Sequence, residues 1–447
     1  MLEPAYQADV VVVGAGIAGL AAAQRLTSAG MTTAVLEAAH DVGGRMATEK
    51  VDGFRLDRIG QLMSTSYPEL RLTPGLDALA LSAFAPGVLL HSDGRRHRVG
   101  APAAQGGARG ALHAVRALAS APRPVSAPRT PLGTAVDQAR LAAALARIAG
   151  TPAGRLLARP DAPAGRALAA RGLSARTVDG FLRPLLAALL CDPELTVSGR
   201  CADLALHSFA SGRLCVPEGG AEVLPQLLAR SLPAGTVHTG VRVTSVSTTS
   251  VTTAEHGVFR CRAVLLATGA RSAAELLPGL RVPDGLPVTV VHHTTDEAPA
   301  TGGALLLDAD RGGPVAHTAV LSAVDPTRAP AGRALVSSTV LGPPPADLDA
   351  AVRTHLARLY GMSTARWETL AVHHTPEAVP VLRPPHDPHR PVRLLAGLYV
   401  CGDHRDTGTV QGALHSASRA ARALVADLGA AGSLHRADPL PSVPRAA

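Results

Sequence analysis

One stretch near the N-terminus decides the fold: Asp9-Val10-Val11-Val12-Val13-Gly14-Ala15-Gly16-Ile17-Ala18-Gly19-Leu20. Its β-branched run predicts a buried strand, and its glycines predict a tight turn into a helix that continues over Leu20–Ser28. A second strand is predicted over Thr32–Leu36. Together these elements form a βαβ unit of about 30 residues, which is how a doubly wound parallel sheet begins.

The glycine spacing in this unit predicts a dinucleotide-binding turn. Gly14 permits the tight turn, Gly16 lets a diphosphate approach the backbone, and Gly19 lets the helix pack closely on the strand. Glu37 ends the second strand, where its carboxylate can accept hydrogen bonds from a ribose diol. The alternative is a glycine-rich turn that binds no ligand. The predicted cofactor contacts here are Gly14, Gly16, Ile17, Ala18, Gly19, Glu37 and Ala38.

Two further segments favour a flavin dinucleotide over a nicotinamide one. Gly43-Gly44-Arg45 offers backbone N–H groups and a guanidinium to a diphosphate, a second grip that an ordinary nicotinamide enzyme does not need. Near the C-terminus a strand ends in Gly402-Asp403, whose carboxylate can hold the hydroxyls of a ribityl chain. The helix that begins near Val410 directs its dipole at whatever precedes it.

In this order, the glycine fingerprint, the acidic residue and Gly-Gly-Arg resemble the superfamily of FAD-dependent amine oxidases, phytoene desaturases and protoporphyrinogen oxidases. The resemblance implies an extended FAD, with Val243 against adenine and with Val410 and Gln411 at the flavin N1/O2 edge. We expect this FAD to be non-covalent, because Cys401 lies inside the strand-end Gly-Asp block. The cofactor contacts added by these segments are Gly43, Gly44, Arg45, Val243, Thr268, Gly269, Gly402, Asp403, Thr409, Val410, Gln411 and Ala413.

The expected fold is α/β: a discontinuous Rossmann-type, glutathione-reductase-like FAD-binding domain with a mixed α+β substrate-binding domain. The FAD-binding domain is predicted over residues 1–75, 210–275 and 385–430. The substrate-binding domain is predicted over residues 76–209 and 276–384, with a helical part near 101–205. Residues 431–447 are expected to form a disordered tail.

Within these domains, the periodicity predicts helices over Gly110–Ala119, Gly133–Ile148, Ala221–Arg230, Ala346–Tyr360 and Val410–Leu428, and a proline-rich loop at Ser120–Pro131. The Pro217-Glu218-Gly219-Gly220 motif predicts a turn. Strands are expected near Val237–Val246, Gly257–Arg260 and Ala263–Ala267 of the first sheet, and at Pro287–Thr295, Ala304–Leu307, Val315–Ala323 and Ala334–Val340 of a second.

The chain departs from amine oxidases of this superfamily at two places. They commonly hold a lysine against flavin N5 through a water, whereas the only lysine here is Lys50. One aromatic residue of their substrate cage is replaced by Thr409. We therefore expect an FAD-dependent oxidoreductase that removes a hydride from a largely apolar small molecule, by desaturation or another dehydrogenation, as in secondary metabolism. No catalytic residue is assigned.

Several alternatives stay open at this point. The chain can be a flavin amine oxidase that lacks the lysine and the aromatic cage, a redox-neutral flavin-dependent isomerase, or a non-enzymatic FAD-binding protein. A nicotinamide-only dehydrogenase is disfavoured by the second phosphate-binding turn. The electron acceptor, oxygen or a quinone, and the oligomeric state are left undetermined.

The composition of the chain limits which binding partners and which cellular compartment we expect. The 447 residues carry a formal net charge of +8, but the positive charge is scattered arginine among few aromatics, so no nucleic acid is expected. The five cysteines form no close pair, and the N-terminus lacks a signal-peptide pattern. The apolar stretch Val10–Ala23 is too short to span a bilayer. We expect a cytoplasmic protein; peripheral membrane contact through a basic helix stays open.

No metal site is predicted. His292-His293 and His373-His374 are adjacent pairs on predicted strands, so the two side chains of each pair point to opposite faces of a sheet. His404-Arg405 directly follows Asp403 and is expected either to border the flavin or to lie in a solvated loop.

Overall fold

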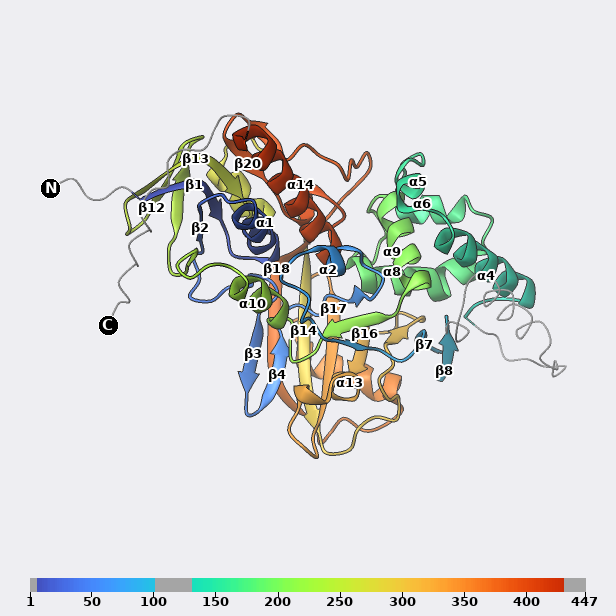
Figure 1. The fold of residues 1–447 in the computed structure, drawn as a ribbon. Coiled ribbons are helices and arrows are strands. Elements are labelled where there is room, and N and C mark those ends of the chain that lie inside the picture. Colours follow the sequence, from blue (N-terminus) through green and yellow to red (C-terminus); the bar gives the residue numbers. More distant parts are fainter. Residues whose placement is uncertain (1–5, 101–130, 430–447) are drawn as a thin grey trace.

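The structure is a computed structural model that describes residues 6–100 and 131–429. Segments that are distant in the sequence meet in one sheet, with the N-terminal strands, β13 and the C-terminal β20 side by side (Figure 1). A second sheet lies below it in this view, and a group of helices lies to the right. Three predicted features lie outside the described residues: the helix at Gly110–Ala119, most of the loop at Ser120–Pro131 and the tail at 431–447.

The first sheet is parallel at its centre, with strand order β10-β2-β1-β13-β12-β11 and with β20 and β19 beside the end of β13. β1 pairs in parallel with β2 and with β13, and β13 pairs in parallel with β20. Its strands are β1 (Tyr6–Val13), β2 (Thr33–Leu36), β10 (Val237–His238), β11 (Val243–Val246), β12 (Ser250–Thr253), β13 (Val258–Leu266), β19 (Arg393–Leu395) and β20 (Leu398–Val400).

The valine run of β1 is continuous because both faces of this sheet are covered. Val10 and Val12 pack with the helices α1 (Ile17–Ser28) and α14 (Val410–Gly429), while Val11 and Val13 pack into a separate core on the other face. Such burial on both faces is typical of a parallel sheet, and it fixes the end of β1 where the glycine turn begins.

The second sheet has the order β18-β14-β17-β16-β15-β7-β8 and is antiparallel except for the parallel pair β15 and β7. Its strands are β7 (Val88–Ser92), β8 (Arg95–Val99), β14 (Gly285–Thr295), β15 (Leu306–Asp308), β16 (Val315–Val320), β17 (Ala334–Leu341) and β18 (Glu368–Pro380). The helix α13 (Leu348–Tyr360) packs its apolar side chains against this sheet. Small sheets are formed by β3 (Thr48–Val51) with β4 (Phe54–Asp57), and by β5 (Met63–Ser64), β9 (Leu214–Pro217) and β6 (Leu81–Ala83).

The helices formed by residues 135–211 share the largest hydrophobic core with strands of the second sheet. Thr134 begins α4 with a capping box to Asp137, which satisfies N–H groups of the first turn. These helices are α4 (Ala135–Ala149), α5 (Ala153–Leu157), α6 (Ala164–Ala169), α7 (Ala175–Thr177), the π-helix η1 (Val178–Leu182), α8 (Arg183–Leu190) and α9 (Gly199–Ser211). The remaining ones are α2 (Glu69–Leu72), α10 (Val223–Arg230), α11 (Ala270–Leu276), α12 (Leu321–Val324) and the 3-10 turns η2 (Pro326–Arg328) and η3 (Asp403–Arg405). Among the helices in the described ranges, none has the length and apolar character needed to cross a membrane.

The expected α/β class and the βαβ start are confirmed, but several element bounds are wrong. Gly257–Arg260 and Ala263–Ala267 are not two strands: they are parts of one strand, β13, which pairs with β12 at its start and with β20 at its end. The strand expected over Val315–Ala323 stops at Val320, where the chain turns into α12. β18 contains the strand expected at His373-His374, but its extent over Glu368–Pro380 was not expected, because its outer half is largely exposed and carries no clear apolar pattern.

Candidate functional site

The glycine turn between β1 and α1 leaves an open surface of backbone. Gly14 adopts φ of +105°, in the region that favours glycine. A Cβ on Gly19 would lie 2.0 Å from the carbonyl oxygen of Gly14, so this residue permits the close approach of helix and turn. Gly16 is different, because a Cβ there would meet no protein atom within 4 Å. The space in front of Gly16 is therefore available to a ligand.

The start of α1 and the carboxylate of Glu37 meet at this turn. The first turn of α1 carries no acidic residue and no side-chain cap, so its positive dipole end is left for an anion. Glu37 Oε2 accepts a hydrogen bond from the Ala15 N–H at 2.7 Å, and its Oε1 accepts one from Ala39 at 2.9 Å. These bonds orient the carboxylate beside the turn, as ribose recognition requires.

The second glycine turn packs directly on the first. The Gly43 N–H donates to the Ala15 carbonyl at 2.9 Å. Arg45 then makes a bidentate ion pair with Asp403, with both N···O distances 2.7 Å, and also donates to the Ala378 carbonyl at 2.7 Å. The two residues predicted to contact a flavin nucleotide from opposite ends of the sequence are thus in contact with each other.

Asp403 stays ionised in this pair. Burial alone would raise the pKa of its carboxyl, but the charge and the hydrogen bonds of Arg45 outweigh burial and lower the pKa below its usual value. The Asp403 loop is held to α14, because Gly402 N–H donates to Ser416 Oγ at 2.9 Å. Thr409 Oγ1 accepts from the Gly412 N–H at 3.1 Å and so caps the start of α14.

These pieces surround one long cavity of about 1040 Å³, at the upper end of the roughly 300–1,000 Å³ that ligand pockets span. One part is lined by Glu37 and Val243, and another by Asp403, Thr409 and Val410. Every predicted cofactor contact lines the cavity except Gly19 and Gln411: Gly14, Gly16, Ile17, Ala18, Glu37, Ala38, Gly43, Gly44, Arg45, Val243, Thr268, Gly269, Gly402, Asp403, Thr409, Val410 and Ala413.

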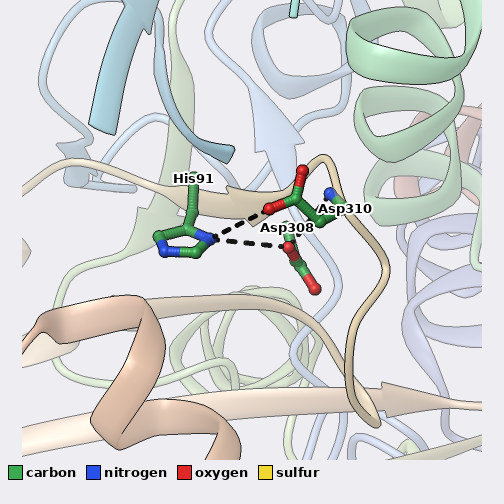
Figure 2. Close-up of side chains that lie close together, drawn as sticks. All are labelled: His91, Asp308 and Asp310. Carbon is green, nitrogen blue, oxygen red and sulfur yellow. Dashed lines mark hydrogen bonds and ion pairs between the residues drawn. The ribbon is translucent and has the colours of Figure 1, made fainter. Parts of the chain in front are cut away.

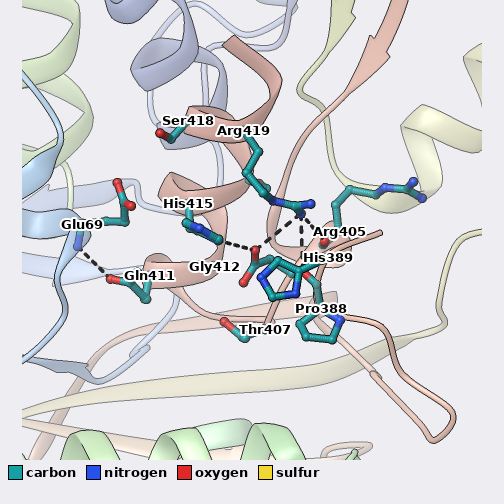
Figure 3. Close-up of polar contacts among 12 residues, drawn as sticks. Glu69, Pro388, His389, Arg405, Thr407, Gln411, Gly412, His415, Ser418 and Arg419 are labelled. Carbon is teal, nitrogen blue, oxygen red and sulfur yellow. Dashed lines mark hydrogen bonds and ion pairs between the residues drawn. The ribbon is translucent and has the colours of Figure 1, made fainter. Parts of the chain in front are cut away.

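Gln411 does not line the cavity, so its predicted place at the flavin edge stays a prediction that rests on its position at the start of α14. Its Oε1 accepts a hydrogen bond from the Glu69 N–H at 3.0 Å (Figure 3). Farther along α14, His415 and Arg419 contact Asp406. Gly19 does not line the cavity, because it lies where α1 packs against the glycine turn.

Sequence reasoning missed several cavity residues. Gln61 lines the cavity and donates to the Gly408 carbonyl at 3.2 Å. The helix α11 and residues 282–285 also contribute lining. α11 directly follows the predicted Thr268-Gly269 turn, and this adjacency could have pointed to it. The contribution of residues 282–285 depends on how the second sheet docks, which no local pattern encodes.

A second, smaller cavity of about 50 Å³ adjoins the first where Arg45, Met46, Gln61 and Val410 line both. Its walls are mostly apolar and include Ile59, Leu62, Phe84, Val216, Leu305, Ala319 and Leu321. Polar side chains are few, and His317 and Thr339 face each other across the β16–β17 register. At about 50 Å³ this cavity is far smaller than the roughly 300–1,000 Å³ of ligand pockets, so it can hold only the end of a ligand whose remainder lies in the long cavity.

His317 is the buried polar group of this second cavity. Its side chain is on β16, its residue is only 5% exposed, and its Nδ1 has no hydrogen-bond partner. Burial lowers the pKa of His317 to about 4, so the ring is neutral at physiological pH. A neutral imidazole with unused hydrogen-bonding capacity can bind a hydroxyl or an uncharged amine.

The residues that the superfamily uses around an amine are absent from this cavity. Lys50, the only lysine of the chain, lies on β3 and pairs with Glu222 at 2.9 Å. Among residues described as lining the two cavities, Phe84 is the sole Phe, Tyr or Trp. Asp57 lines the second cavity, but Arg328, Thr48 and the Ala221 N–H already occupy its carboxylate.

The remaining candidates lie outside both cavities. Cys401 is fully buried in the core between β20 and α14, and burial raises its thiol pKa to about 12. His404 and Arg405 neither border the long cavity nor lie in a solvated loop: both are buried. The strand placement of the histidine pairs is confirmed. His292 contacts the Asp57 carbonyl, whereas His293 points to Asp349 on the other side.

Comparison with known proteins places this architecture. The family model for flavin-containing amine oxidoreductases matches residues 17–425. A putrescine oxidase from Kocuria rosea is 46% identical over 100 residues, which span 21% of this chain and 20% of that relative. A solved double mutant of putrescine oxidase superposes with a TM-score of 0.67 at 19% identity, covering 95% of this chain and all of the other. An oxidoreductase from Methanosarcina mazei superposes with a TM-score of 0.69 at 16% identity, covering 92% of this chain and 99% of the other. The curated relative is therefore matched over only about a fifth of its length, and the solved structures support the fold.

Proposed function

The chain belongs to the flavin-containing amine oxidoreductase family, and we propose that it is an FAD-dependent oxidoreductase that removes a hydride from a small, largely apolar substrate. The observation that carries this proposal is the apolar second cavity, which adjoins the long cavity at Arg45, Met46, Gln61 and Val410 and can receive the reacting end of a substrate. The product would gain a C=C, C=N or C=O bond.

FAD fits the long cavity by the chemistry of its lining. The α1 N-terminus and the open space at Gly16 suit the diphosphate, and the Glu37 carboxylate suits the ribose diol. Asp403, ionised beside Arg45, suits the ribityl hydroxyls. The bound flavin supplies the two-electron chemistry by accepting the hydride. Non-covalent binding is supported by the burial of Cys401 away from the cavity.

On the substrate side, the apolar walls exclude water and His317 orients the polar group. A pKa of about 4 makes His317 a weak base at neutral pH, so it anchors the substrate and does not take its proton. Thr339, buried beside it, is a second hydrogen-bonding group. For a C=N or C=O product the proton on the nitrogen or oxygen leaves to water, and for a C=C product the proton of the neighbouring carbon leaves to water, while in each case the hydride leaves from carbon.

The second candidate is oxidation of an amine, which the likeness to putrescine oxidase favours. An ammonium bound in an apolar cavity needs a carboxylate or an aromatic face. The Asp57 carboxylate is already paired with Arg328, which is fully buried. We therefore propose that any amine substrate is a monoamine bound uncharged, and that diamines are poor substrates.

We also propose a cytoplasmic location and oxygen or a quinone as the electron acceptor. All five cysteines are free thiols, which supports a reducing compartment. Nucleic acid is not proposed as a partner. Peripheral membrane contact remains a proposal without a described surface to support it.

The test is anaerobic mixing of the FAD-loaded protein with a matched panel: a cyclic alcohol, the monoamine of the same ring, and a linear diamine of similar size. We expect the alcohol or the monoamine to bleach the flavin absorption band, with the monoamine faster at alkaline pH, and the diamine to leave it unchanged. The variant His317→Phe should keep FAD and raise KM more than it lowers kcat. Faster bleaching by the diamine than by either other compound would overturn the proposal.

A further inference from the structure

A compact group of metal-ligating side chains lies in the second sheet, outside both cavities. His91 is the penultimate residue of β7 and Asp308 is the last residue of β15, and the two are direct partners in the parallel register of these strands. Asp310 follows in the next loop. His91 Nδ1 lies 3.7 Å from Asp308 Oδ1 and 3.8 Å from Asp310 Oδ2, with the ring directed at both carboxylates (Figure 2).

His91 has no hydrogen-bond partner for either ring nitrogen, although its side chain is only 3% exposed. The distances to the two carboxylates exceed the roughly 2.7–3.2 Å of a hydrogen bond. Buried polar groups are nearly always bonded, so an imidazole left in this position has an unused ligand atom.

The two carboxylates are held by other groups on their outer sides. Asp308 Oδ2 accepts hydrogen bonds from the Gly312 N–H, from His355 Nε2 at 3.0 Å and from Arg358 at 3.2 Å. His355 Nδ1 accepts from the Val315 N–H, so its Nε2 carries the proton and donates.

Asp310 is fixed in the same way. Its Oδ1 accepts from Ser92 Oγ at 3.0 Å, and its Oδ2 accepts from the Asp93 N–H at 2.9 Å. The two oxygens nearest His91 each accept one backbone hydrogen bond, Asp308 Oδ1 from the Asp310 N–H at 3.1 Å and Asp310 Oδ2 from the Asp93 N–H, and each keeps a second lone pair. Two carboxylates face one arginine charge here, which leaves a net negative charge for a cation to balance. Supporting hydrogen bonds of this kind orient the ligands of protein metal sites.

We propose that His91, Asp308 and Asp310 form a binding site for one divalent transition-metal cation of the Zn²⁺ or Mn²⁺ class. Tetrahedral metal–ligand bonds of about 2.0–2.2 Å place two ligand atoms roughly 3.3–3.6 Å apart, so the spacings of 3.7 and 3.8 Å here need to shorten by only a few tenths of an ångström when an ion binds. One imidazole with two carboxylates suits these ions better than Mg²⁺, which prefers oxygen ligands only. Water would complete the coordination from the exposed side of Asp310.

The bound ion would be structural. It joins β7 to β15, the only parallel neighbours of the second sheet among its described strands, and so fixes the β7–β8 edge of that sheet. Nothing in the sequence pattern points to the group, because the ligands come from different segments that only the sheet brings together.

The experiment uses the FAD-loaded protein, dialysed against a chelator and then titrated with ZnCl₂, MnCl₂ or MgCl₂ by calorimetry, with thermal unfolding followed in parallel. We expect one equivalent of Zn²⁺ or Mn²⁺ to bind and to raise Tm, and Mg²⁺ to bind much more weakly. Asp310→Asn should weaken binding at least tenfold, and His91→Ala should abolish it. The matched control is His97→Ala, a half-buried histidine of the neighbouring strand β8, which should bind like the parent.

Because Asp310 is exposed, its variant tests the site even if His91→Ala fails to fold. The proposal is overturned if no saturable Zn²⁺ or Mn²⁺ binding is found. It is equally overturned if Asp310→Asn binds the metal as tightly as the parent, since the ion would then lie elsewhere.

Discussion

Replacing Gly16 by alanine should separate cofactor binding from folding. Gly16 has φ of −72° and ψ of 174°, which any residue adopts, and an added Cβ would meet no protein atom within 4 Å. The same Cβ would project into the cavity that we assign to the FAD diphosphate. The cofactor-free protein therefore has room for the methyl group, whereas the diphosphate does not.

The expected magnitudes differ strongly for the two states. Gly→Ala reduces the entropy of the unfolded chain by about 0.4–1 kcal/mol, but alanine is a poorer N-cap than glycine by a similar amount. The stability of the apoprotein should thus change by less than about 1 kcal/mol. Displacing the diphosphate by a methyl radius loses one or two hydrogen bonds to a charged group, at about 1.5–3 kcal/mol each. FAD affinity should fall roughly 10- to 20,000-fold.

The assay is urea unfolding of the apoprotein, followed by titration with FAD monitored by flavin fluorescence. Gly154→Ala in α5 is the matched control, because its Cβ also meets open space and it lies away from the cavity. Unchanged FAD affinity in Gly16→Ala would refute the placement of the diphosphate. Unfolding of the Gly16→Ala apoprotein would refute the claim that the space before Gly16 is free.

Three further perturbations follow from the same structure. Glu37→Arg places a cation where the Ala15 and Ala39 N–H groups converge, so the variant should purify without FAD; a variant as yellow as the parent would show that Glu37 is misplaced. Asp403→Asn removes the charge partner of Arg45 and should lower the unfolding free energy of the apoprotein by about 1–3 kcal/mol, measured in urea; no change would mean that the pair is not formed. Four buried histidines have pKa values lowered to about 4, so the unfolded chain binds more protons below about pH 6.5 and stability should fall as pH drops from there toward 4. The four histidines are His292, His293, His317 and His404, and near pH 5 each should lower the free energy of unfolding by about 1–2 kcal/mol. The urea midpoint near pH 5 should therefore be lower than the midpoint near pH 7.5. Equal midpoints would contradict the burial of these rings in their neutral form.

The nucleotide cavity could be predicted from the sequence because its chemistry is local. The turn at Gly14, the strand-end position of Glu37 and the start of α14 each depend on residues that are neighbours in the chain. Such short segments have their own backbone requirements, namely a positive φ at Gly14 and a helix start at Val410. The class of ligand can therefore be predicted from these short segments alone.

The second cavity and the metal-ligating group could not be predicted in this way. In the sequence, His317 is one of several histidines that lie in apolar strand segments. Only the packing of β16 beside the Gln61 loop places it next to the long cavity. His91 and Asp308 meet only because β7 pairs with β15. The contact of the Gln411 side chain with the Glu69 N–H could not be predicted for a related reason, because Glu69 belongs to a helix that is distant in the sequence.

The most direct measurement is the flavin content of the purified protein. The account predicts one FAD for each chain, released intact when the protein is unfolded in acid and taken up again by the apoprotein on return to neutral pH. If the folded protein contains no flavin and does not bind added FAD, the long cavity lined by Gly16, Glu37 and Asp403 has another occupant, and the account is contradicted.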